Sequence, residues 1–128
     1  MKKILLIIAM LVSLSVTKAV SNNYYVEKGI PNIVRGLDSN IDGLIESCIY
    51  QSVMLKNKYP EFNYNGILSK LKSLSLNGAS IKIRYQAHLA YLYIKNTDQF
   101  GEVNLNLDAD PEDNFRTLIN KIERLASR

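Results

Sequence analysis

The sequence predicts an all-α fold of packed helical hairpins, and three observations lead to this prediction. Apolar residues recur every three or four positions along most of the chain, as they do on one face of a helix. Residue pairs that end or begin helices separate these runs, at Tyr59-Pro60, Asn77-Gly78 and Asp110-Pro111. Only residues 103–107 alternate as a strand does. An orthogonal helical bundle is the alternative arrangement of the same helices.

The first half of the chain predicts a mobile start followed by two helices. Residues 20–27 show no periodicity. A short helix is expected next, with Pro31 in its first turn and an apolar face at Ile30, Ile33, Val34 and Leu37. Ser39 and Asp42 then resemble a capping box ahead of a helix over residues 41–58. Its buried positions are expected at Leu44 or Ile45, Ile49, Ser52 or Val53, and Leu55 or Lys56.

Two further helices follow the loop at residues 61–63. The third helix has an apolar face at Ile67, Leu68, Leu71 and Leu74, with Lys70 and Lys72 toward solvent. Asn77-Gly78 ends it, and Ser80 caps the fourth. The fourth helix has one apolar face at Ile83, Ala87, Ala90 and Ile94 and a second at Tyr85, Leu89 and Leu92. A helix that is apolar around most of its circumference is expected to pack between neighbours, and its alanines would permit close approach.

The pattern changes after Asn96. Residues 100–107 hold the alternating stretch, which predicts either an extended segment across helix ends or part of a hairpin, because a lone strand forms no sheet. Asp110 is expected to cap a last helix, with Pro111 at its first position and acidic residues in its first turn. The apolar face of this helix is Phe115, Leu118, Ile119, Ile122 and Leu125, and Lys121, Arg124 and Arg128 lie near its end.

The two helix pairs can be overlaid in sequence with an offset of 38 residues. The overlay places Ile30 on Leu68, Ile33 on Leu71, Ile45 on Ile83, Ile49 on Ala87, Ser52 on Ala90, Val53 on Tyr91 and Phe62 on Phe100, with Lys56 on Ile94 as a mismatch. Helix–turn–helix units of this length are typical of α-solenoids.

The second unit, with Ile83-Arg84 followed by Ala87 and Ala90, resembles the second helix of a HEAT repeat. Over residues 29–95 the resemblance implies a short right-handed α-α superhelix that binds proteins and has no catalytic residues of its own. The first unit departs from the pattern because Glu46 stands where the second unit has Arg84.

The N-terminus has the features of a signal peptide. Lys2-Lys3 precede an apolar stretch from Ile4 to Val16, and Thr17-Lys18-Ala19 places small residues where a signal peptidase reads. The stretch is shorter than the roughly 20 residues that span a bilayer, so cleavage after residue 19 is expected, with a retained anchor as the alternative. The prediction is therefore a signal peptide at 1–19 and a single small helical domain at 20–128, in the periplasm or secreted.

Export changes how the charge and the cysteine are interpreted. The chain has a net charge of +4, but loss of Lys2, Lys3 and Lys18 leaves 13 basic and 12 acidic side chains. The mature charge therefore gives no reason to expect nucleic acid as a partner. Cys48 is the only cysteine, so no disulfide forms within the chain, and its helical surroundings predict a buried structural thiol.

No residue set predicts catalysis or metal binding. His88 is the only histidine and has no carboxylate beside it in sequence, so an exposed ring or a polar contact is expected. The acids Asp98, Glu102, Asp108, Asp110, Glu112 and Asp113 form a run without a cation. Asp108 and Asp110 resemble the first two ligands of a calcium loop. However, Asp113 stands where that loop needs a glycine, and Ile119 stands where it needs its final glutamate, so helix capping is the expected role of these acids. Tyr85, Tyr91 and Tyr93 are expected in the core rather than stacked on bases or sugars.

The function expected from these features is that of an exported, non-enzymatic protein-interaction module without cofactor, catalytic or metal-binding residues. Its partner would be another envelope or secreted protein. Two alternatives remain at this level: a periplasmic enzyme or enzyme accessory that uses acidic residues in 98–113, and an envelope-associated protein that meets lipid or peptidoglycan. After signal cleavage no stable membrane span is expected.

Overall fold

The structure is a computed structural model that describes residues 23–100, 103–106 and 108–127. Residues 23–37 are helical, and the elements that follow are α2 (Asp42–Lys58), α3 (Asn65–Asn77), α4 (Ile81–Lys95), the single turn α5 (Thr97–Phe100) and α6 (Pro111–Ala126). Within the described ranges no residue belongs to a strand. The predicted all-α class is therefore confirmed.

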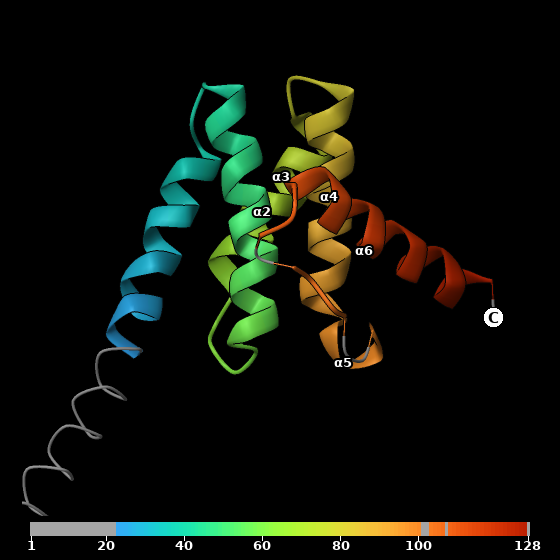
Figure 1. The fold of residues 1–128 in the computed structure, drawn as a ribbon. Coiled ribbons are helices and arrows are strands. Elements are labelled where there is room, and N and C mark those ends of the chain that lie inside the picture. Colours follow the sequence, from blue (N-terminus) through green and yellow to red (C-terminus); the bar gives the residue numbers. More distant parts are fainter. Residues whose placement is uncertain (1–22, 101–102, 107, 128) are drawn as a thin grey trace, which may run out of the picture.

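Two helical hairpins stand side by side, with both hairpin turns at the same end of the molecule (Figure 1). The helix of residues 23–37 pairs with α2, and α3 pairs with α4. Helix α4 contacts α2, α3, α5 and α6, so it is the central element, as its apolar circumference predicts. Its residues Ile83, Ala87 and Ala90 are fully buried. The alanines allow the neighbouring helices to approach the α4 backbone closely.

The second apolar face of α4 differs from the prediction. Tyr85 is 49% exposed, whereas Leu89 and Tyr93 are buried. Tyr85 lies one turn after the exposed Ile81, on a stripe of α4 that no other helix covers. Tyr93 instead faces α2, where its hydroxyl donates to Asn57 Oδ1 at 2.9 Å. Burial raises the pKa of Tyr93, so its hydroxyl stays protonated and available for this bond.

The first helix is longer than the sequence indicates. The predicted mobile segment at 20–27 is wrong for residues 23–27, which are helical, and residues 20–22 lie outside the described residues. Val26 is buried while Tyr24 and Tyr25 are exposed, so this turn is amphipathic with only one strongly buried position. Pro31 consequently lies inside the helix rather than in its first turn. Its side chain is exposed, so its ring does not separate the helix from the core.

The helix caps match the predictions in two of three places. Ser80 Oγ accepts from the Ile83 amide at 3.1 Å, and Asp110 Oδ1 accepts from the Glu112 amide at 3.0 Å. The capping box of Ser39 and Asp42 is wrong, because Ile41 is the N-cap residue of α2 and has no side-chain cap. Ser39 Oγ instead accepts from the Ile41 amide within the turn.

The turn between α3 and α4 is fixed on both sides. Gly78 ends α3, and a Cβ there would lie 2.6 Å from the Leu74 carbonyl oxygen, so only glycine fits. The Arg84 guanidinium donates to the Gly78 carbonyl at 2.7 Å. Arg84 is the residue on which the HEAT-like resemblance rests, and here it ties the second helix of the hairpin to its turn.

The alternating stretch forms no strand at residues 103–106, while residues 101, 102 and 107 lie outside the described ranges. The segment is held by a side chain of α6. The Asn106 amide donates to Asn114 Oδ1, and Asn114 Nδ2 donates to the Asn106 carbonyl at 2.8 Å and to the Tyr50 hydroxyl at 2.8 Å. Asn114 thereby replaces the strand partner that this segment lacks and connects it to α2.

Candidate functional site

A groove of about 840 Å³ runs between the helix of residues 23–37 and α2. It is larger than the polar hollow of about 450 Å³ between α2, α4 and α6. The groove is lined by residues of both helices and of the α2 C-terminus: Gly29, Asn32, Ile33, Arg35, Gly36, Leu44, Cys48, Gln51, Met54, Leu55, Lys58 and Tyr59. Leu44 is 45% exposed although it lines the groove, so the groove is open to solvent there.

Two glycines determine the shape of the groove. At Gly36 the helices are in direct contact, because a Cβ there would overlap Cys48 Sγ. At Gly29, two turns earlier, a Cβ would meet nothing within 4 Å. The first helix therefore touches α2 near the hairpin turn and leans away from it toward residue 23, as Figure 1 shows. The space between the diverging helices is the groove.

The groove combines an apolar lining with two positive charges. Ile33, Leu44, Met54 and Leu55 supply most of its hydrocarbon surface, and the only charged side chains in the lining are Arg35 and Lys58. Neither cation forms an ion pair with a described residue: Arg35 donates to Asn32, and Lys58 lies 5.5 Å from the centre of the Tyr59 ring. An apolar surface edged with unpaired cations favours a ligand that carries both hydrocarbon and carboxylates.

Cys48 lies in the groove lining as a buried, free thiol, as predicted. Burial raises its pKa, so at neutral pH the sulfur is a thiol and not the thiolate that nucleophilic chemistry requires. It acts here as an apolar atom against Gly36. Cys48 therefore supplies no thiolate to the groove.

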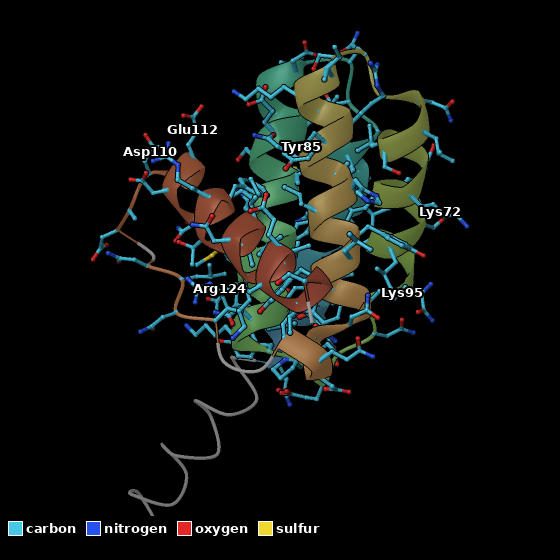
Figure 2. All side chains as sticks on the ribbon, turned by 90° about the vertical axis from the view of Figure 1, so that its right-hand side faces the viewer. Lys72, Tyr85, Lys95, Asp110, Glu112 and Arg124 are labelled. Carbon is cyan, nitrogen blue, oxygen red and sulfur yellow. The ribbon has the colours of Figure 1, made fainter. Side chains whose placement is uncertain are left out.

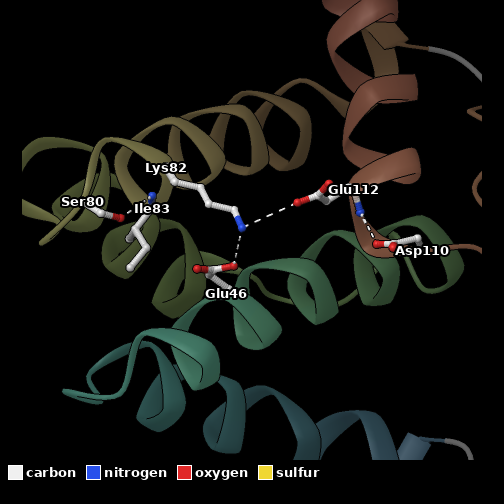
Figure 3. Close-up of polar contacts among 6 residues, drawn as sticks. All are labelled: Glu46, Ser80, Lys82, Ile83, Asp110 and Glu112. Carbon is white, nitrogen blue, oxygen red and sulfur yellow. Dashed lines mark hydrogen bonds and ion pairs between the residues drawn. The ribbon is translucent and has the colours of Figure 1, made fainter.

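A second, more polar hollow of about 450 Å³ lies where α2, α4 and the start of α6 meet. Lys82 Nζ lies 3.2 Å from Glu46 and 3.7 Å from Glu112 (Figure 3). The hydrogen bond and charge of Glu46 raise the pKa of Lys82, with a smaller contribution from Glu112. The contribution of these ion pairs to stability is therefore present at neutral pH and is lost as alkaline pH deprotonates Lys82. Because Lys82 and Glu112 are exposed and Glu46 is partly exposed, these ion pairs add little to the free energy of unfolding.

The predicted candidate residues do not come together in one site. His88 is exposed on α4, and Tyr85, Tyr91 and Tyr93 range from exposed to fully buried, so they share no stacking surface. Asp98, Asp108, Asp110, Glu112 and Asp113 are exposed, and Glu102 lies outside the described residues. In Figure 2 Asp110 and Glu112 stand at the start of α6, away from Tyr85.

The acidic run divides into separate structural roles. Asp110 caps α6, Glu112 faces Lys82, and Asp113 lies 3.8 Å from Arg116. Across the ranges that the structure describes, no three side chains of histidine, cysteine, aspartate or glutamate are placed to share a metal ion. The sequence predicts Ile33 and Cys48 as buried positions, but it does not predict a groove beside them. The available signal was the pair of glycines, Gly29 and Gly36, inside an otherwise helical pattern.

No family model, curated protein or solved structure matches this chain. Among the helices of the described ranges, none has the length and hydropathy needed to cross a bilayer. The function must therefore be argued from the groove itself.

Proposed function

We propose that this chain is an exported, non-enzymatic protein-interaction module that binds an envelope or secreted partner in the groove between residues 23–37 and α2. The observation that carries the proposal is the open apolar groove itself, with Leu44 exposed in its lining and two cations that form no ion pair with a described residue. Apolar grooves that are bordered by polar residues are a common form of interaction site. The lining has no carboxylate or histidine, and burial keeps its Cys48 as a thiol, which fits a binding role better than a catalytic one.

The finer proposal is that the hairpins form a short HEAT-like superhelix. Its support is the agreement of burial with the 38-residue offset: Ile33 and Leu71, Ile45 and Ile83, Ile49 and Ala87, and Ser52 and Ala90 are all buried. In such arrays each hairpin packs against the next and partners bind along the exposed helices. An orthogonal bundle remains the alternative arrangement for this function.

Export is tested by N-terminal sequencing of the protein recovered from cells that express the full chain. The Lys2-Lys3 start, the apolar stretch and Thr17-Lys18-Ala19 predict a mature chain that begins near Val20. Recovery from the cytosol with Met1 intact would reject export.

Partner binding is tested with a photo-crosslinking amino acid placed at Leu44 or, as a control, at Tyr85. These residues are similarly exposed, at 45% and 49%, but only Leu44 lines the groove. In the native envelope, a discrete protein adduct is expected from position 44 and not from position 85, and mass spectrometry identifies it. Adducts from position 85 alone would place the partner on the open stripe of α4 and reject the groove as the interaction site.

A further inference from the structure

The groove has features that define the chemistry of its occupant, and this inference rests on the proposed function. We infer that the groove binds an amphipathic helix whose apolar face is flanked by carboxylates about three turns apart. The apolar lining, the positions of the two cations and the shape of the groove each contribute to this inference.

The charges give the sign of the partner. Arg35 and Lys58 are the charged residues of the lining, and no carboxylate lies among them. Their cationic ends are exposed, so a partner carboxylate can reach them without the desolvation that a buried ion pair requires. A partner with cations at the same places would meet repulsion from both.

The spacing of the cations gives the length of the partner. Gly36 contacts Cys48, so Arg35 lies level with Cys48 on the opposite wall. Ten residues of α2 separate Cys48 from Lys58, which is about 15 Å along the helix at 1.5 Å per residue. Carboxylates eleven residues apart on a helix lie on one face and roughly 16 Å apart. Residues between them on that face would contact Ile33, Met54 and Leu55.

The shape of the groove favours a helix over an enclosed small ligand. The groove is open on its solvent side, where Leu44 remains accessible, and it lies between two helices that diverge. A helix that lays its apolar face into such a groove forms a three-helix arrangement, a common mode of peptide recognition. A small apolar ligand would leave much of the open side uncovered.

The test uses protein purified from the envelope of cells that express the full chain and three fluorescent helical peptides. The first peptide has glutamates eleven residues apart with leucines between them on the same face. The second has lysines in place of the glutamates, and the third has the first composition in scrambled order. Anisotropy at low ionic strength is expected to show binding of the acidic peptide about tenfold tighter than of the basic one. This preference should decrease as salt screens the charges.

Three variants locate the binding. Gly29→Leu places a side chain in the open groove and should lower the affinity for the acidic peptide by about tenfold or more. Gly43→Leu is the matched control, since Gly43 is also helical, has open space around its Cβ and lies outside the groove. It should leave affinity unchanged. The double variant Arg35→Glu, Lys58→Glu should reverse the preference to the basic peptide.

Equal binding of the acidic and basic peptides, no binding of either, or equal loss with Gly29→Leu and Gly43→Leu would each overturn the inference. Self-association abolished by Gly29→Leu would also overturn it, by making a second copy the occupant. The proposed function is judged separately by the Leu44 adduct. If that adduct forms while the peptides fail to bind, the partner chemistry is wrong and the interaction site stands.

Discussion

The two hairpins of this protein follow one sequence pattern but close to different degrees. The 38-residue offset places Gly29 on Ile67 and Gly36 on Leu74. In α3, Ile67 is fully buried and Leu74 packs against the core, so α3 and α4 close on each other. In the first hairpin the same two positions have no side chain, and a groove remains beside Gly29. The groove thus arises where one unit omits a core side chain that the other unit has.

The same difference affects the stability of each helix. The helix of residues 23–37 contains Gly29, Gly36 and Pro31, which together lower its intrinsic helix propensity by several kcal/mol relative to alanine, at about 1 kcal/mol per glycine and about 3 for proline. Helix α3 has one glycine, Gly66, near its start. The first helix therefore depends more on its contacts with α2, which suits a wall that adjusts to a partner.

The largest difference between the hairpins is expected from truncating an equivalent residue pair. Leu71→Ala removes a fully buried side chain from the closed hairpin and should lower the free energy of unfolding by about 2–5 kcal/mol. Ile33→Ala removes the equivalent side chain of the first hairpin, which borders the groove. Its loss in free energy of unfolding should be at or below the low end of that range, because little new cavity forms. Urea unfolding measures both. Equal losses would mean that the first hairpin is as tightly packed as the second.

A second test examines how tightly the neighbouring helices pack against α4. Ala90 has no exposed surface, so Ala90→Leu should overpack the centre and lower stability by about 1–3 kcal/mol. Lys72→Ala, on the exposed side of α3, is the control and should change stability by less than about 0.5 kcal/mol. Similar denaturant midpoints for the two variants would show that α4 has room at Ala90 and is not the central element.

The sequence predicted the helices better than the space between them. Helical spacing and caps located α3, α4 and α6, and they identified Ile83, Ala87 and Ala90 as core, because burial leaves a periodic record in the residues that are buried. The groove leaves only the two glycines as a trace in the sequence. Its shape also depends on the angle at which the first helix leaves Gly36, and that angle is set by packing against α2, which the sequence pattern does not show.

The errors have similar causes. Residues 23–27 looked irregular because one buried position, Val26, is too few to form a pattern. The prediction for Tyr85 is wrong because periodicity shows which residues share a face, but not whether another helix covers that face. The export signal, the partner and the HEAT-like superhelix stay predictions.

The third test concerns α6, which lies outside the two hairpins. Asp110→Ala removes the oxygen that accepts from the Glu112 amide and should lower stability by about 0.5–2 kcal/mol. Adding millimolar calcium to the wild type should leave the melting temperature unchanged, because capping needs no ion. A rise in melting temperature that grows with calcium concentration and disappears in Asp108→Ala would show an ion site at this turn instead.

The smallest effect, of opposite sign, is expected from filling the groove. Gly29→Leu gives the first hairpin the kind of side chain that Ile67 provides in the second. A Cβ at Gly29 meets nothing within 4 Å, so no strain opposes the change. Replacing a helical glycine should therefore raise the free energy of unfolding by up to about 1 kcal/mol. Thermal and urea unfolding measure the gain.

Gly36→Ala is the contrasting variant, since its Cβ would overlap Cys48 Sγ and it should destabilise the protein. Adding Cys48→Ala removes that sulfur and should recover part of the loss, because the two residues are in contact and their effects are coupled. If Gly29→Leu destabilised the protein as Gly36→Ala does, the first helix would lie against α2 along its whole length. The groove, and the contrast between the two hairpins, would then both be incorrect.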